Sequence, residues 1–138
     1  MPFKVTLIET GLNTKTAGRL KQVLSYIDSD HFMLTYGDGV ADINFHELLA
    51  FHQQKNKLCT MTSIIPEGRF GTMEIDEHDV VQDFKEKPKD DNHWINGGFF
   101  VLEPSVLETI KGDGTTWEQE PLRGLSAKGE LHAYKHRG

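Results

Sequence analysis

The feature that most constrains the fold of this chain is an apolar segment, Phe32–Leu34, that runs directly into a turn-forming sequence at 35–42. This second segment reads Thr-Tyr-Gly-Asp-Gly-Val-Ala-Asp, so that one carboxylate, Asp38, stands between two glycines. The pattern predicts a buried strand that leaves the core and ends in a turn whose backbone can approach a ligand. Ligands of α/β proteins bind at the carboxyl ends of strands, and an Asp held there suits a hard cation such as Mg²⁺. An ordinary Asp-Gly turn would account for the same residues.

Composition and charge favour a single globular domain and exclude several classes of protein. The chain has 138 residues, of which 37% are hydrophobic, and a formal net charge of −6. Its lysines and arginines are scattered, which argues against binding to nucleic acid. It has no apolar run of about 18 residues, so no membrane span is expected. The single cysteine, Cys59, lies in an apolar run, which excludes an internal disulfide and fits a reducing cytoplasm.

Hydrophobic periodicity predicts strands and helices that alternate along the chain. The expected strands are 3–8, 32–36, 58–65, 72–75, 80–85, 94–102 and 131–136. The expected helices are 19–27, 43–54, 104–112 and 116–127. Alternation of this kind implies an α/β fold with a mixed, mostly parallel sheet and helices on both faces. The β-rich region 58–102 is interpreted as a small layer beside the main sheet that forms one wall of a pocket.

Several residues predict where these elements begin or are interrupted. Asp42 is expected to cap the helix 43–54. Thr116, with Gln119 three residues later, matches a capping box at the start of the last helix. Gly97 and Gly98 interrupt the strand 94–102. Glycine inside a strand often marks the close approach of a ligand or of another backbone, so a functional and a structural explanation both remain open.

Three other segments could bind a phosphorylated ligand. Glu86 and Lys87, followed by proline, end a strand, where the acid could contact a sugar hydroxyl and the lysine a phosphate. Taken alone, this pair is better explained as a solvated strand end. Thr14–Arg19 precedes a helix, whose free N–H groups attract anions, and Gly18 would let a flat base lie close, although a threonine-rich cap is the alternative. Gly71 could expose backbone donors to a hydroxyl or simply form a turn. No histidine pair has the spacing of a zinc site.

Taken in order, these elements resemble the sugar-phosphate nucleotidyltransferases. The matching runs span nearly the whole chain and are 5–11, 14–21, 36–42, 68–71, 86–89, 95–102 and 115–122. The runs 36–42 and 115–120 resemble the cytidylyl branch of the family, which makes CDP-glucose for the deoxysugars of bacterial surface polysaccharide. The resemblance implies an incomplete Rossmann-like nucleotidyltransferase fold. Residues 1–138 would form one partial domain, with a nucleotide side at about 1–57 and a sugar-phosphate side at about 58–138.

The resemblance also implies a role for each candidate residue. Asp38 would hold Mg²⁺ and, with Lys87, take part in catalysis. The residues expected to line a CTP pocket are Thr14, Gly18, Arg19 and Gly37. The residues expected to bind glucose 1-phosphate are Gly71, Glu86, Lys87, Asn96, Gly97 and Glu118. The sugar phosphate would attack the α-phosphorus of CTP in line and release pyrophosphate, in an enzyme that forms a homo-oligomer at full length.

Two parts of the family pattern are missing from the chain. One is the Gly-rich loop that follows the family's first strand, together with a phosphate-binding lysine. The other is a second metal-binding Asp, which the family has beyond the point where this chain ends. We therefore expect the 138-residue chain by itself to have negligible transferase activity. The alternative is a non-catalytic module that binds a sugar phosphate or a sugar nucleotide, although retention of Asp38 favours the enzyme.

Overall fold

The computed structural model describes residues 2–66, 72–85 and 94–138 of the chain. The strands are β1 (Phe32–Thr35), β2 (Cys59–Ile64), β3 (Thr72–Ile75), β4 (Val81–Lys85), β5 (Ile95–Leu102) and β6 (Leu131–Lys135). The helices are α1 (Thr16–Val23), the 3₁₀ helix η1 (Leu24–Tyr26), α2 (Phe45–Lys55), α3 (Ser105–Glu108) and α4 (Glu120–Ala127). The strands expected from β1 onward are therefore confirmed to within one residue at each end.

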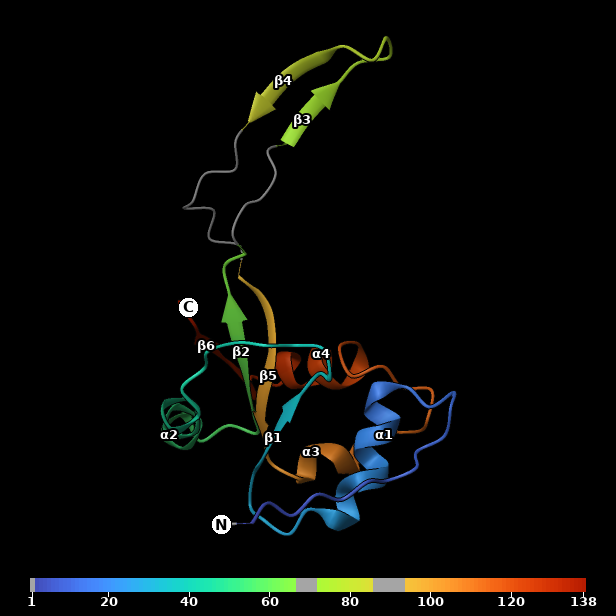
Figure 1. Cartoon of the computed structure of the whole chain (residues 1–138), viewed down its shortest axis with the longest axis vertical. Coiled ribbons are helices and arrows are strands. Elements are labelled where there is room, and N and C mark those ends of the chain that lie inside the picture. The colour runs from blue at the N-terminus through green and yellow to red at the C-terminus, as the bar shows by residue number, and fades with distance from the viewer. Residues whose placement is uncertain (1, 67–71, 86–93) are drawn as a thin grey trace.

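The main sheet has four strands in the order β1-β5-β2-β6 (Figure 1). β5 pairs antiparallel with both β1 and β2, and β2 pairs parallel with β6. The α/β class and the mixed sheet are thus confirmed, but the expectation of a mostly parallel sheet is wrong for the described strands. β1 and β2 do run in the same direction, as strands joined by a crossover helix do. β5 lies between them in the opposite direction, and the described residues that connect β2 to β5 form the β3–β4 hairpin rather than a crossover helix.

The separate β-rich layer is smaller than the sequence suggests. β2 and β5 are the two central strands of the main sheet, so the assignment of the whole region 58–102 to a side layer is wrong. Only β3 and β4 form a second sheet, an antiparallel hairpin that projects away from the main sheet in Figure 1. Local periodicity identifies a strand but not its pairing partner, which explains the error.

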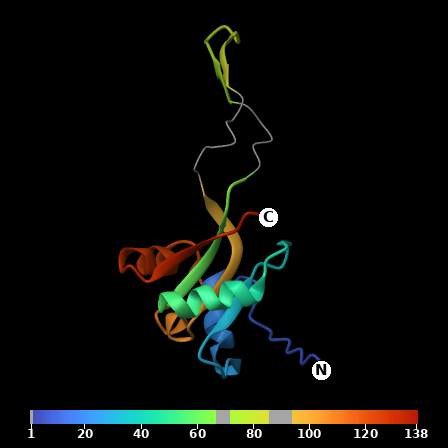
Figure 2. The same ribbon diagram turned by 90° about the vertical axis from the view of Figure 1, so that its left-hand side faces the viewer.

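Helices cover both faces of the main sheet, as the sequence predicts. Along β5, Phe100 and Leu102 pack in the cluster formed with α1, α3 and α4. Phe99 and Val101 point to the other face and pack with Leu48 of α2. Successive side chains of a strand point to opposite faces, so one strand supplies both cores. Figure 2 shows α2 across one face with the other helices behind the sheet. None of the described helices is long and apolar enough to cross a membrane.

The N-terminal segment differs from its prediction. Residues 3–8 form neither strand nor helix, and the exposed fractions of Phe3, Val5 and Leu7 are 98%, 77% and 92%. Their alternation with polar residues suits a strand, but a strand also needs a neighbour that pairs with its backbone. No described strand pairs with this segment, so the predicted strand is wrong here.

The start of α2 also differs from its prediction. α2 begins at Phe45, and its N-cap is Asn44, whose Oδ1 accepts hydrogen bonds from the backbone N–H groups of His46 (3.1 Å) and Glu47 (3.3 Å). The cap assigned to Asp42 is therefore wrong. Asp and Asn are equally good N-cap residues, so residue type alone could not choose between them.

The last helix begins later than its capping-box pattern suggests. α4 starts at Glu120, with Pro121 in its first turn, and residues 117–119 form a turn ahead of it. The cap assigned to Thr116 is wrong, because the Thr116 side chain does not cap the described helix. Proline in the first turn of a helix has no N–H that needs a partner, which favours a start at this position.

Candidate functional site

Three segments that are far apart in the sequence meet at one end of the main sheet. They are Tyr36 at the end of β1, Asn96 near the start of β5, and Glu118 in the turn before α4. The Tyr36 hydroxyl donates a hydrogen bond to Oε1 of Glu118, and Nδ2 of Asn96 donates one to the Tyr36 hydroxyl at 3.2 Å. The structure therefore brings together two residues predicted to bind sugar, Asn96 and Glu118.

The Gly97-Gly98 pair has a structural cause at both positions. Gly98 has a φ of +80°, and a Cβ there would lie 3.1 Å from Cδ2 of Tyr36. A Cβ on Gly97 would lie 2.8 Å from Oγ1 of Thr62, a hydroxyl that also donates to the carbonyl of Phe99 at 2.9 Å. Both glycines thus allow a close approach, one to a tyrosine ring and the other to β2. Ligand binding by Gly97 stays a prediction.

The Asn96 amide is held in one orientation. Its Oδ1 accepts a hydrogen bond from the backbone N–H of Gly98 at 2.8 Å, while its Nδ2 donates to Tyr36. Asn96 is exposed, and among the described residues no acceptor pairs with the second N–H of its amide. An exposed amide with a fixed orientation is suited to bind a hydroxyl of a ligand.

Tyr36 is the residue of this network whose role was not predicted from the sequence. Burial, followed by the hydrogen bond to Glu118, raises the pKa of Tyr36 to about 12, so its hydroxyl stays protonated at neutral pH. Its ring packs edge-on against the ring of Phe100, with 6.0 Å between the ring centroids. The Phe100 ring in turn packs edge-on against Trp117, with 5.8 Å between centroids. The signal in the sequence was an aromatic hydroxyl at a strand end beside Gly37 and Asp38.

Asp38 lies in the turn after β1, two residues beyond Tyr36, and is exposed. A Cβ on Gly37 would meet no atom within 4 Å, so the backbone there faces open space. The described residues contain no group of three or more His, Cys, Asp or Glu side chains that could hold a metal ion. Mg²⁺ is commonly bound through one or two carboxylates together with substrate phosphates. Asp38 would hold the ion in that way, and this role stays a prediction.

The loop that carries Asp38 is tied to the end of β6. Oδ1 of Asp42 lies 2.9 Å from Nε2 of His136, and the His136 backbone N–H donates to the carbonyl of Ser63 at 2.9 Å. This contact, rather than helix capping, is the interaction that Asp42 makes. It links the segment after β1 to the same end of the sheet where β6 ends.

Three of the four predicted nucleotide residues, Thr14, Gly18 and Arg19, lie around the start of α1. Thr14 donates from its hydroxyl to the Thr10 carbonyl at 2.5 Å, and the Arg19 guanidinium donates to the Thr10 hydroxyl and to the Leu12 carbonyl. A Cβ on Gly18 would lie 2.6 Å from Cα of Asp113, so Gly18 allows α1 to pack on that backbone. Contact of these residues with a nucleotide stays a prediction.

The remaining predicted site residues, Gly71, Glu86 and Lys87, lie outside the described residues. In the sequence they flank the β3–β4 hairpin, Gly71 directly before it and Glu86 directly after it. Their roles in binding sugar and phosphate stay predictions.

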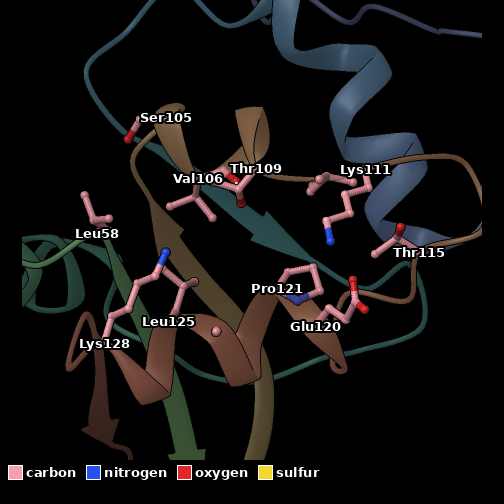
Figure 3. Close-up of a pocket in the computed structure, with 12 residues that line it drawn as sticks. Leu58, Ser105, Val106, Thr109, Lys111, Thr115, Glu120, Pro121, Leu125 and Lys128 are labelled. Carbon is pink, nitrogen blue, oxygen red and sulfur yellow. The ribbon is translucent and has the colours of Figure 1, made fainter.

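A cavity of about 350 Å³ lies between α3 and α4 (Figure 3). Val106 and Leu125 contribute apolar walls, and Lys111, Glu120 and Lys128 are among its charged residues. None of the predicted site residues lines it. The cavity is therefore separate from the polar network around Tyr36.

The sequence matches the model of the nucleotidyl transferase family over residues 2–132, and the chain belongs to this family. It is 50% identical over 138 residues to a glucose-1-phosphate cytidylyltransferase of Salmonella typhi, a match that covers 99% of this chain and 53% of that protein. A probable glucose-1-phosphate cytidylyltransferase of Bacillus subtilis is 45% identical over 137 residues, again with 99% and 53% covered. The chain therefore spans about half the length of these relatives, and the family expected from the sequence is confirmed.

Solved structures support the same fold. HddC from Yersinia pseudotuberculosis, complexed with GMP-PN, superposes with a TM-score of 0.64 at 19% identity, covering 94% of this chain and 56% of that one. A putative glucose-1-phosphate thymidylyltransferase from Bacillus anthracis gives a TM-score of 0.67 at 15% identity, covering 93% and 55%. At these identities the likeness concerns the fold alone, which is the Rossmann-like α/β fold of nucleotidyltransferases.

Proposed function

We propose that this chain forms the sugar-binding part of an enzyme that transfers the cytidylyl group of CTP to glucose 1-phosphate. The observation that carries the proposal is the meeting of Asn96 and Glu118 beside the turn of Asp38, in a chain 50% identical to a glucose-1-phosphate cytidylyltransferase. An oxygen of the sugar phosphate would form a bond to the α-phosphorus. The bond from that phosphorus to the β-phosphate oxygen would break, and pyrophosphate would leave with the electron pair.

The protein's part in this reaction is to position two anions that repel each other. Asn96 and Glu118 would bind sugar hydroxyls, and Gly71, Glu86, Gly97 and Lys87 would complete the sugar-phosphate site. Thr14, Gly18, Arg19 and Gly37 would line the nucleotide site. Asp38 would hold Mg²⁺, which, when bound, neutralises charge on the phosphates. No covalent intermediate with the protein is required.

Turnover is the measurement that tests this proposal. Pyrophosphate release is measured on the protein at its native length, with glucose 1-phosphate and each of the four ribonucleoside triphosphates. We expect CTP to support release and Asp38→Asn to abolish it. Equal release with all four triphosphates would contradict cytidylyl specificity. Absence of release with all four would contradict the transferase proposal.

A non-catalytic module that binds a sugar phosphate is the second candidate. It is favoured by the fact that the described residues assemble the Tyr36, Asn96 and Glu118 network within this chain alone. Glucose 1-phosphate at about 100 times its dissociation constant should then stabilise the chain by about 2.7 kcal/mol. A raised melting temperature with glucose 1-phosphate, together with no pyrophosphate release, would support the module. No shift with this ligand would exclude it.

A further inference from the structure

We infer that Tyr36 is a positioning residue of the sugar site, whose hydroxyl holds Glu118 and Asn96 so that together they offer one acceptor and one donor to hydroxyls of the sugar. The inference rests on the proposed function, because it concerns the same site. It goes beyond that function by naming the group that sets the site's selectivity for hydroxyl-bearing ligands.

The proton positions follow from the chemistry of the three groups. An ionised Glu118 carboxylate can only accept, so the single proton of the Tyr36 hydroxyl points to its Oε1. The hydroxyl oxygen then accepts a hydrogen from Nδ2 of Asn96 at 3.2 Å. The Gly98 N–H occupies Oδ1 of Asn96 at 2.8 Å, which prevents the amide from turning over. The hydrogen bonds between these three side chains therefore have a single donor and acceptor arrangement.

Two hydrogen-bonding positions are left over. Among the described residues, Oε2 of Glu118 and the second N–H of Asn96 have no hydrogen-bond partner. Both side chains are exposed, so a ligand can reach them. A sugar hydroxyl donates and accepts at once, so one hydroxyl, or two neighbouring ones, can satisfy both positions. A deoxy sugar that lacks a hydroxyl bound here would leave at least one of these positions unpaired, which a site of this kind disfavours.

Packing holds both ends of the Tyr36–Glu118 hydrogen bond. The Tyr36 ring contacts Phe100, and Phe100 contacts Trp117, which has no exposed surface and directly precedes Glu118. Gly98 leaves the space that the Tyr36 ring needs. Because this row of edge-on aromatic contacts anchors the tyrosine and the carboxylate together, removing the hydroxyl should free Glu118 without removing the ring contacts.

Tyr36→Phe is the variant that tests this inference, because it keeps the ring and deletes the hydroxyl. Tyr134→Phe is a matched control, since the Tyr134 hydroxyl also donates to a carboxylate, Oε2 of Glu47 at 3.3 Å, and its ring also packs edge-on, against Phe51. Affinities for glucose 1-phosphate, its monodeoxy analogues and inorganic phosphate are measured by calorimetry. We expect Tyr36→Phe to weaken glucose 1-phosphate binding about three- to tenfold, with phosphate binding unchanged. Tyr134→Phe should bind like the wild type.

The monodeoxy analogues separate positioning from a general structural effect. We expect the wild type to bind at least one analogue more weakly than glucose 1-phosphate, and Tyr36→Phe to lose this discrimination. A structural defect would weaken every ligand in proportion. Glu118→Gln, which removes an acceptor while keeping the side chain's size, should lose the same discrimination. Full discrimination in Tyr36→Phe would overturn this inference alone, whereas a wild type that does not bind glucose 1-phosphate would overturn the proposed function as well.

Discussion

Nδ1 of His52 lies 2.9 Å from the hydroxyl oxygen of Thr60, and this hydrogen bond joins α2 to the central strand β2. Both side chains are buried, with exposed fractions of 4% and 0%. Burial lowers the pKa of His52, and the neighbouring His31, whose ring lies 6.3 Å away, lowers it further. The imidazole is therefore neutral in the folded protein over a range of pH in which an unfolded chain would protonate it.

Stability should consequently fall in acid. Below about pH 6.5, the ordinary pKa of histidine, the unfolded state binds a proton that folded His52 resists, so the free energy of unfolding decreases as pH falls toward the lowered pKa. His52→Gln can still pair with Thr60 and does not titrate, so its stability should depend less on pH in this range. Urea unfolding between pH 5 and 8 measures this. The control is His46→Gln, at an exposed position of the same helix, whose stability should depend on pH as that of the wild type does. The same slope of unfolding free energy against pH in all three proteins would contradict the prediction.

Gly98→Ala should destabilise the fold. The positive φ and the 3.1 Å contact with the Tyr36 ring both oppose a Cβ, and such strain costs about 1–3 kcal/mol. Gly124→Ala is a control of opposite sign, because a Cβ inside α4 meets no atom within 4 Å. Alanine in a helix is favoured over glycine by about 0.5–1 kcal/mol. Chemical denaturation of both variants measures the two changes in stability. A Gly98→Ala variant as stable as the wild type would show that β5 can relax at this position.

Asn44→Ala should weaken the start of α2 by about 1 kcal/mol, because it removes the acceptor for two backbone N–H groups. Hydrogen exchange at the His46 and Glu47 amides should become faster. Asp42→Ala removes only its contact with His136 and should leave exchange at these amides unchanged. Faster exchange in Asp42→Ala would restore the capping role that the sequence suggested for this residue.

Gly18→Ala should loosen the packing of α1 on the loop before α4. A Cβ at position 18 would lie within 2.9 Å of three backbone atoms of Asp113, and backbone cannot move aside as a flexible side chain can. Overpacking of this kind typically costs about 1–3 kcal/mol. Gly112→Ala, beside the same loop, meets no atom within 4 Å and should be nearly neutral. The difference in melting temperature between the two variants measures the effect.

Much of the local structure could be predicted from residue patterns. An apolar run without charged residues located the strand that became β2, and helical spacing located α2 to within two residues at its start. The helix prediction succeeds because burial of one face imposes a period on the sequence, and the strand prediction succeeds because a central strand has little room for charges. The segment 3–8 fails by the same logic, since its period suits a strand but no described strand pairs with it.

The candidate site likewise combines features that local sequence predicts with features that it does not. The sequence by itself determined the ingredients, which are the turn with Asp38, the strand with Asn96 and the run with Glu118, together with membership of a nucleotidyltransferase family. Only the tertiary structure decided that Tyr36 joins Asn96 to Glu118 and that β5 lies between β1 and β2. The physical reason is the distance along the chain over which each effect acts. A residue's period and propensity act within a few neighbours, whereas strand order and side-chain hydrogen bonds between distant residues are set by how the whole core packs.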